Sequence, residues 1–314
     1  MKNIYIVDSN LDYEKINSFI NNSKYSNYMQ CPNWAKYRKN KNYFEIVVIE
    51  SDKIIAYGVA YPLFKYNKRN LYFPRGPILN YDDEKVISLF KIQMKKYFYK
   101  NNYDALLIDP AITKELKGFQ SKNSNDYFNQ QYSSQEAIVD LTKVDSSKDI
   151  WESFESKARA YIKIAIKNKI DVTISNTSFN LDRFTFLYNI NARLRKFPTK
   201  TKEEFEQFLE ANQTICAYIQ KGEQILNMAI FIKHMDTLYY IFGANDKEND
   251  FFHGSYMLHY EMIKYAKTIG AKSYNFGGVF CKIEDKQSKE YGLLRFKKMF
   301  TREFKNYIGE IAFE

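Results

Sequence analysis

The sequence predicts an α/β (α+β) protein made of two similar domains in tandem. Its 314 residues exceed the size at which a single hydrophobic core usually stops growing. Hydrophobic residues make up 45% of the chain and aromatic residues 17%, which is ample for two packed cores. The order of predicted elements in the first half, strands followed by a helix and a further strand, returns in the second half.

The first half predicts a small sheet with helices before and after its first strands. Apolar residues three and four positions apart predict helices, and alternating or β-branched runs predict strands. Ser51-Asp52 fits a hairpin turn between two of the strands, and the polar residues 110–135 predict a loop-like end to the domain. The predicted elements are helices at 11–22, 34–38 and 83–99 and strands at 43–50, 53–61, 70–73 and 105–108.

The second half opens with helices and then repeats the order of the first half. Its last part predicts a strand running into a glycine turn, a short helix that places Phe296 beside Lys297, and a closing strand at 307–310. The other elements are helices at 147–169, 179–196, 202–211 and 255–268 and strands at 215–220, 225–233, 238–242 and 272–276. We place the boundary at 142–147, which gives domains 1–145 and 146–314, the second including the C-terminal strand.

Several classes of protein are excluded by composition. No run of residues reaches the 18 to 20 apolar residues, roughly, that a membrane span needs, and the N-terminus has no signal-peptide pattern, so we expect a cytoplasmic protein. The three cysteines are far apart and form no CxxC pair, and the three histidines have no zinc-ligand spacing. Neither a metal site nor a disulfide is expected.

The positive charge of the chain is concentrated in one segment. Lysine and arginine number 47 against 37 acidic residues, a net charge of +10, and residues 146–200 hold 11 of the basic and 5 of the acidic side chains. Arg159, Lys163 and Lys167 are spaced four apart and would form a basic stripe along one helix face. Such a stripe suits contact with the phosphates of a nucleic acid, although a solvated helix face explains the same spacing.

Three segments resemble those of a known family. They are Gln30-Cys31-Pro32-Asn33-Trp34-Ala35-Lys36, then Tyr72-Phe73-Pro74-Arg75-Gly76-Pro77, and a tail made of 274–278, 294–300 and 307–310. Their order and spacing resemble the FemABX aminoacyltransferases, which build peptidoglycan cross-bridges from aminoacyl-tRNA. The resemblance covers nearly the whole chain and implies two tandem acetyltransferase-like (GNAT) domains with mixed β-sheets. Without a long run of heptads, the chain resembles the compact, FemX-like members, which have no helical-hairpin insertion.

The resemblance implies a reaction and its partners. An amino acid would pass from aminoacyl-tRNA to the stem-peptide amine of a peptidoglycan precursor, either UDP-MurNAc-pentapeptide, which compactness favours, or lipid II. Ordinary GNAT proteins cradle coenzyme A with a glycine-rich turn, but residues 249–255 contain one glycine here. Coenzyme A is therefore not expected, and no cofactor is required. We expect a monomer, with peripheral membrane contact left open.

The family pattern assigns the chemistry to Lys297. When an amine attacks the aminoacyl ester, negative charge develops on the carbonyl oxygen, and a lysine ammonium can stabilise it. The resemblance gives this role to the lysine of the Phe296-Lys297 pair. Asp109, at the end of a buried strand, could accept a proton from the attacking amine or cap a turn. Arg75 fits a structural role in its turn.

The acceptor-binding residues of the family match this sequence less completely. The family binds the acceptor diphosphate with a lysine four residues after Trp34, where this chain has Arg38, and Lys36 is the near alternative. Lys200 takes the place of a second phosphate-binding arginine. Positions where the family has tyrosines hold Glu204, or Phe205 in a shifted register, and Phe242.

Two rival interpretations follow from these departures. In one, the enzyme class stays and the acceptor is an antibiotic peptide or another amine. In the other, the chain is a non-catalytic RNA-binding protein, which predicts aromatic residues interleaved with basic ones at the surface. The amino acid that is transferred has no signature in the sequence.

Overall fold

The computed structural model describes residues 4–38, 42–114, 116, 132–279, 286–288 and 290–313. Contacts between residues divide the chain into two compact units. Unit 1 comprises Met1–Gln135 and Asn306–Glu314, and unit 2 comprises Glu136–Lys305. Much of the predicted loop 110–135, as well as Cys281, lies outside the described residues.

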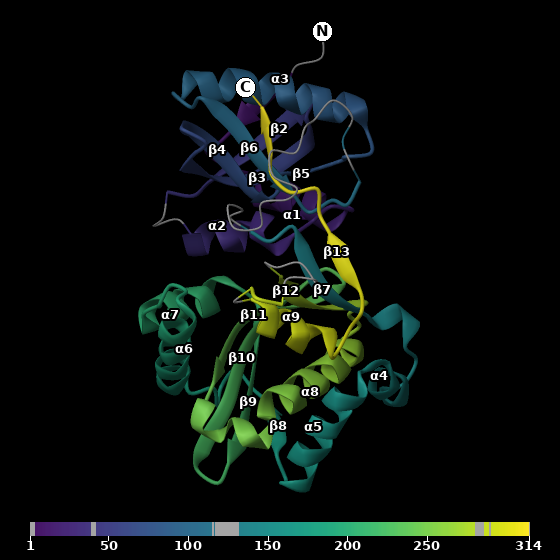
Figure 1. The fold of residues 1–314 in the computed structure, drawn as a ribbon. Helices are drawn as coiled ribbons and strands as arrows, with labels where there is room; N and C mark the ends of the chain where they lie inside the picture. Colours follow the sequence, from purple (N-terminus) through teal and green to yellow (C-terminus); the bar gives the residue numbers. More distant parts are fainter. Residues whose placement is uncertain are drawn as a thin grey trace. The chain divides into compact units, whose positions relative to one another are not determined.

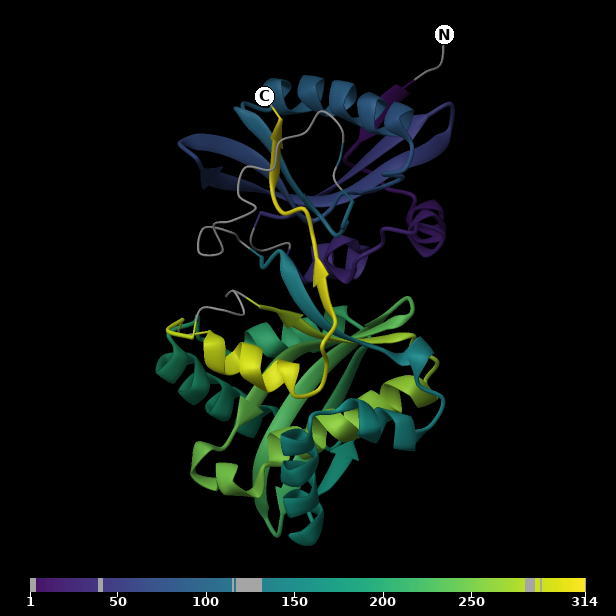
Figure 2. The ribbon, with the colours of Figure 1, turned by 45° about the vertical axis from the view of Figure 1, so that its right-hand side comes forward.

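Unit 1 is a mixed sheet with helices on both faces. The strands run in the order β1-β2-β3-β4-β6-β14, and β5 pairs with β3. Helix α3 covers one face, and α1 and α2 lie on the other (Figures 1 and 2). The elements are β1 (Ile4–Val7), α1 (Tyr13–Asn21), α2 (Pro32–Arg38), β2 (Phe44–Glu50), β3 (Lys53–Lys65), β4 (Lys68–Arg75), β5 (Ile78–Leu79), α3 (Glu84–Lys100), β6 (Ala105–Pro110) and β14 (Ile311–Phe313).

Local sequence explains most of these elements. Ser51 and Asp52 both have positive φ, as a tight hairpin turn between antiparallel strands requires, so that predicted turn is confirmed. The side chain of Asp83 accepts hydrogen bonds from the backbone N–H groups of Lys85 and Val86 and begins α3. The helices and strands predicted for this half all occur, with ends shifted by up to four residues, whereas β1 and β5 were not predicted.

Two of the family-like segments meet inside unit 1. Gln30 is fully buried, and its amide donates to the carbonyls of Val59 and Pro74 and accepts from the Val59 N–H. A Cβ at Gly76 would lie 2.3 Å from the Gln30 side chain. The segment 30–36 is thus joined to the segment 72–77 by one buried amide, which needs a glycine beside it.

The C-terminal residues belong to unit 1, which differs from the predicted division. Ile311 pairs with Ile108 and Phe313 with Leu106, so β14 is an edge strand beside β6. Just before it, the buried carboxylate of Glu310 accepts from the Lys65 ammonium at 2.5 Å. The boundary near 135 also precedes the predicted 142–147. The reason is that Gln135–Asp140 forms a strand of the unit 2 sheet.

Unit 2 is a second mixed sheet, in the order β13-β7-β12-β11-β10-β9-β8. Helices α5 and α8 lie on one face, and α6 and α7 lie on the other (Figure 1). The elements are β7 (Gln135–Asp140), α4 (Ser147–Ser153), α5 (Ser156–Lys167), β8 (Asp171–Ile174), α6 (Leu181–Arg195), α7 (Lys202–Ala211), β9 (Thr214–Lys221), β10 (Gln224–His234), β11 (Thr237–Asn245), η4 (Lys247–Phe252), α8 (Gly254–Thr268), β12 (Ser273–Gly278), α9 (Tyr291–Lys298) and β13 (Phe304–Asn306).

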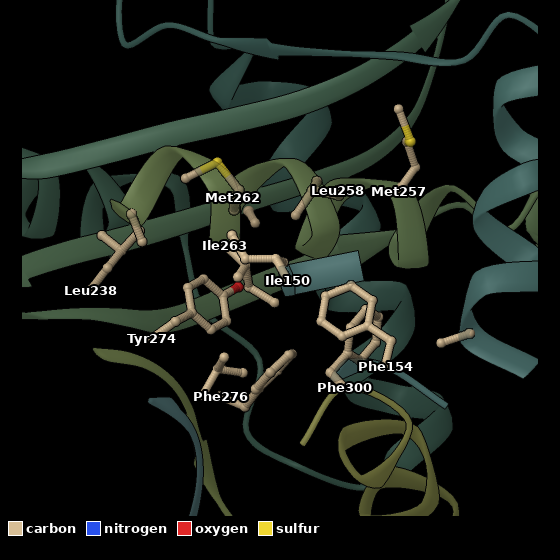
Figure 3. Packing of buried hydrophobic residues seen from close by; sticks show 14 of the residues in the cluster. Ile150, Phe154, Leu238, Met257, Leu258, Met262, Ile263, Tyr274, Phe276 and Phe300 are labelled. Atoms are coloured by element: carbon tan, nitrogen blue, oxygen red, sulfur yellow. The ribbon is translucent and has the colours of Figure 1, made fainter. Parts of the chain in front are cut away.

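The predicted helix at 147–169 is wrong as one element. Phe154 and Glu155 have extended backbone angles and separate α4 from α5. The break buries Phe154, whose ring meets the rings of Tyr260 and Phe300, and the Glu155 N–H donates to the Met299 carbonyl. Figure 3 shows this part of the core, where side chains of α8 meet Tyr274 and Phe276 of β12.

The two units differ in how far their parallel strands stay paired, and this difference opens a site in unit 2. In unit 1 the parallel strands β4 and β6 stay paired from Asn70↔Ala105 to Arg75↔Pro110. In unit 2 the parallel strands β11 and β12 pair only from Thr237↔Ser273 to Tyr239↔Asn275, although both continue further. The pair in unit 2 therefore opens toward its carboxyl end.

Candidate active site

A cavity of about 320 Å³ lies in unit 2 at the open ends of β11 and β12. Helices α8 and α9 supply most of its other walls. Its lining residues are Arg195, Met228, Ala229, Tyr240, Asn245, Lys247, Asp250, Ser255, Tyr256, Leu258, His259, Phe276, Gly292, Leu293, Phe296 and Lys297. Polar groups and apolar or aromatic side chains thus share the lining of this hollow, as is typical of ligand sites.

The irregular end of β11 shapes one wall of the cavity. Ile230 of β10 pairs with Phe242, but the next residue, Phe231, pairs with Tyr240, so Ile241 is an extra residue in β11. This bulge directs Tyr240 into the cavity and Phe242 into an aromatic cluster with α6 and α7. A Cβ at Gly243 would lie 1.7 Å from the Tyr240 hydroxyl, so only glycine allows this ring position.

Lys297 is the buried charged residue of the cavity lining. It is 4% exposed, and its Nζ donates to the carbonyl oxygens of Gly277 and Gly278 at 3.0 and 2.6 Å. Burial lowers its pKa to about 8, and the nearby carboxylates of Glu136 and Glu290 oppose that change. The predicted Phe296 lies next to it in the cavity wall, half-buried against Tyr256 and Phe300.

His259 lies in the same cavity and was not among the residues that the sequence singled out. Its Nδ1 is 2.6 Å from the Tyr274 hydroxyl, and aromatic rings surround its own ring. Burial, together with the charge of Lys297, lowers its pKa to about 3, so the imidazole is neutral. The signal for it in the sequence is a histidine on the apolar face of α8, which zinc-ligand spacing does not detect.

The glycine at the start of α8 has a packing role. A Cβ at Gly254 would lie 1.8 Å from Oδ1 of Asn227 on β10. Asn227 in turn donates to Asn245 Oδ1 at 2.8 Å and to Ser255 Oγ at 3.1 Å. Contact with this polar network therefore explains the single glycine of 249–255.

Arg38 in unit 1 is a cation held by aromatic rings. Its guanidinium lies 4.9 Å from the ring of Trp34, 4.8 Å from that of Tyr37 and 5.7 Å from that of Tyr43. Among the interactions of the described residues, no carboxylate pairs with it. Lys36, two residues before Arg38, is exposed. Of these two candidates on α2, Arg38 is thus the one with a fixed position.

The structure brings Lys200, Glu204 and Phe242 together in unit 2. Lys200 Nζ is 3.7 Å from Glu204 Oε1 and 5.8 Å from the Phe242 ring. The amide of Asn189 holds the backbone of Lys200 through two hydrogen bonds, and Phe205 also packs on Phe242. Glu204 therefore offsets part of the charge that Lys200 could offer to a phosphate.

The carboxylate of Asp109 is buried in unit 1 and is held by neighbouring side chains. It is 1% exposed, and its Oδ2 accepts from Arg75 Nη1 at 3.1 Å and from the Tyr72 hydroxyl at 3.3 Å. Arg75 also donates to the Ser133 carbonyl and lies 4.8 Å from the Tyr307 ring. The pair joins the ends of β4 and β6, the strands of unit 1 that correspond to β11 and β12 of unit 2. The structural role predicted for Arg75 fits these contacts.

The basic stripe is only partly open to solvent. Lys163 and Lys167 are exposed on α5, but Arg159 is half-buried. Its guanidinium donates to the carbonyls of Glu152 and Phe154 at 3.2 and 2.5 Å, near the end of α4. Arg159 thus stabilises the break between the two helices, and the two lysines remain as candidates for binding RNA.

Within the part of the chain that the structure describes, no group of three histidine, cysteine or carboxylate side chains is arranged to hold a metal ion. Within the same residues, no helix combines the length and the apolar character needed to cross a bilayer.

Comparison with known proteins gives two similar enzymes. UDP-N-acetylmuramoylpentapeptide-lysine N(6)-alanyltransferase from Weissella viridescens is 23% identical over 317 residues, covering 95% of this chain and 92% of the relative. Lipid II:glycine glycyltransferase from Staphylococcus epidermidis is 22% identical over 389 residues, covering 97% and 92%. The longer second alignment means that the glycyltransferase contains segments that this chain lacks.

Solved structures confirm the predicted fold of two tandem GNAT-like domains. A crystal structure of FemX has a TM-score of 0.81 at 18% identity and covers 98% of this chain and 96% of its own. A tandem GNAT protein from the clavulanic acid biosynthesis pathway has a TM-score of 0.54 at 7% identity, covering 100% and 98%.

A family model extends over most of the sequence. The model of the FemAB family matches residues 11–144 and 199–314. The interval between these ranges contains the basic stripe of α5. Since the match includes well over half of the residues, the chain belongs to the FemAB family, as a compact member.

Proposed function

We propose that the protein transfers an amino acid from aminoacyl-tRNA to the stem-peptide amine of a peptidoglycan precursor. The observation that carries this proposal is the buried ammonium of Lys297 in a cavity at the open ends of two parallel strands. The two relatives are named for alanyl and glycyl transfer to cell-wall precursors, which supports the same class of reaction here.

The proposed reaction mainly requires a positive charge close to the carbonyl oxygen of the aminoacyl ester. The amine nitrogen attacks the ester carbonyl carbon, the carbonyl oxygen becomes an oxyanion, and the ribose oxygen of the tRNA then leaves. The nitrogen loses one proton and the ribose oxygen gains one, so no external reductant or energy source is required. A buried ammonium beside aromatic side chains stabilises that oxyanion far better than an ammonium in water would.

UDP-MurNAc-pentapeptide is our preferred acceptor. The relative whose alignment matches this chain in length is the one named for the UDP-linked precursor, whereas the lipid II enzyme is longer. The ion pair between Lys200 and Glu204 argues the other way, because it leaves less positive charge for a phosphate. It favours the alternative interpretation, in which the acceptor is an antibiotic peptide or another amine. Incubation with mixed charged tRNAs and each precursor, followed by mass spectrometry, tests both the reaction and the acceptor.

Arg38→Ala is expected to weaken binding of UDP-MurNAc-pentapeptide by about 1 to 3 kcal/mol, because a charge-assisted contact to phosphate would be lost. Calorimetry measures this change. Lys36→Ala, on the same helix but exposed, is the matched control and should bind almost as the parent does. Equal affinity in the parent and Arg38→Ala would contradict a phosphate site at Arg38.

The tRNA contact is assigned to the exposed lysines of α5. Neutralising Lys163 and Lys167 should raise the Michaelis constant for aminoacyl-tRNA and lower the log-log salt slope by up to about 2, since each phosphate contact contributes slightly less than one. Arg159→Ala is the informative comparison, because its present contacts predict a loss of thermal stability instead. If the double variant keeps the parent's salt slope, the stripe is a solvated face.

A further inference from the structure

A carboxylate and an amide are buried behind Lys297. Glu136 of β7 is 8% exposed and Asn275 of β12 is 2% exposed. The Asn275 Nδ2 donates to Glu136 Oε2 at 2.7 Å, and the Oδ1 of the same amide accepts from the Gly277 N–H at 2.7 Å. One side chain thus links a buried anion to the glycine turn.

That turn holds the Lys297 amine. The pairing of β12 with β7 shifts between Asn275↔Ile138 and Gly278↔Glu136, so β12 bulges at this point, and Gly277 has a φ of 78°. The bulge presents the carbonyls of Gly277 and Gly278 to Lys297 Nζ. A continuous set of hydrogen bonds therefore runs from Glu136 through Asn275 and the turn to the ammonium.

The charge of Glu136 acts on the same amine. Burial lowers the pKa of Lys297, and Glu136, followed by Glu290 just before α9, raises it again. The imidazole of His259, which also lines the cavity, is neutral. The other titratable groups that line the cavity are Arg195 of α6, Lys247 and Asp250 of η4, Tyr240 of β11 and Tyr256 of α8. Tyr274 of β12 contacts the cavity residue His259 through its hydroxyl.

We propose that Glu136 and Asn275 are positioning residues for aminoacyl transfer. Asn275 fixes the glycine turn so that the amine of Lys297 stays in the cavity, and Glu136 orients Asn275 and favours the charged amine. The proposal rests on the function proposed for Lys297. Neither residue is part of the cavity lining, so both act through Lys297 rather than on a substrate.

The electrostatic part is tested with Glu136→Gln, which keeps an oxygen for Asn275 and removes the charge. The pKa of Lys297 should fall by about one pH unit, as expected for loss of a nearby opposite charge. NMR titration of the Lys297 ε-carbon measures this directly, with the signal assigned by its absence in Lys297→Met. The high-pH limb of kcat/KM, expressed per neutral acceptor amine, should move by the same amount. Asp140→Asn, on the same strand, is the control.

The geometric part is tested with Asn275→Ala, in which the turn loses its anchor. We expect kcat to fall by about tenfold or more at every pH, because small displacements of a catalytic group are costly. Glu136→Asp covers the case in which Glu136→Gln does not fold. It keeps the charge and shortens the reach to Asn275, so kcat should fall while the pH limb stays in place.

The outcomes separate this proposal from the proposed function. An unchanged Lys297 pKa in Glu136→Gln, or a parental kcat in Asn275→Ala, would overturn the positioning role. If the pKa moves as expected and the kcat/KM limb does not follow, the pair does tune Lys297, but the ammonium is not the active form. In that case the positioning role stands and the proposed chemistry fails.

Discussion

Replacing Lys297 by methionine is expected to slow the chemical step by about a hundredfold or more, because one preplaced oxyanion donor contributes roughly 3 kcal/mol. Methionine has a similar length and fills the same space without the charge. Single-turnover kinetics with prebound aminoacyl-tRNA and acceptor measures the chemical step apart from binding. Acceptor affinity should be nearly unchanged, since the charge acts on the transition state.

A neighbouring lysine provides the control for this prediction. Lys298 follows Lys297 on α9 but is half-buried and not part of the cavity lining. Lys298→Met should therefore turn over at close to the parent rate. If Lys297→Met matched the parent as well, Lys297 could not be the oxyanion donor, and the proposed function would lose its main support.

The pH dependence gives a second, independent check on the same residue. Burial lowers the pKa of Lys297 to about 8, so the ammonium dominates below that pH and the neutral amine above it. The attacking amine must be neutral, so kcat/KM is expressed per neutral acceptor amine. On that scale, kcat/KM falls as the pH rises through about 8 if the Lys297 ammonium is the active form. A value that rises across this range would instead indicate that the neutral Lys297 amine acts as a base.

Local patterns in the sequence predicted the elements of the fold but not all of their partners. Apolar spacing located most helices and strands of both halves but not β1, β5, β8 and β13, and the tail motif located Phe296 and Lys297. The predicted closing strand at 307–310 is wrong, because those residues lie between β13 and β14. The short strand β7 was missed because it follows a polar stretch, and with it Glu136 was missed. The placement of β14 beside β6 depends on pairing across about 200 residues, which no local pattern contains.

The remaining differences have local physical causes. The break at Phe154 and Glu155 contains neither proline nor glycine, and it is stabilised by burial of Phe154 and by the contacts of Arg159. The four-residue spacing predicts that Arg159 belongs to the basic stripe with Lys163, but its guanidinium donates to backbone carbonyls of α4 and the break. Spacing along a helix identifies a face but cannot say whether a long side chain folds back onto its own backbone.

The ion pair of Arg75 and Asp109 leads to the second large prediction, which concerns stability. Asp109→Ala is expected to lower the free energy of unfolding by about 3 to 5 kcal/mol, because the buried guanidinium would lose its carboxylate. Both side chains are almost fully buried, so solvent cannot replace the lost contact. Urea unfolding followed by circular dichroism measures the change.

The double variant Arg75→Met, Asp109→Leu and the milder Asp109→Asn decide between a structural and a catalytic role for Asp109. With both charges removed, the double variant should recover much of the lost stability, since no unpaired charge stays buried. Asp109→Asn keeps the shape of the side chain, and its folded fraction should turn over at nearly the parent rate if the carboxylate only joins β4 to β6. A drop in kcat of about a hundredfold in folded Asp109→Asn, within the range of general-base catalysis, would restore Asp109 as the proton acceptor.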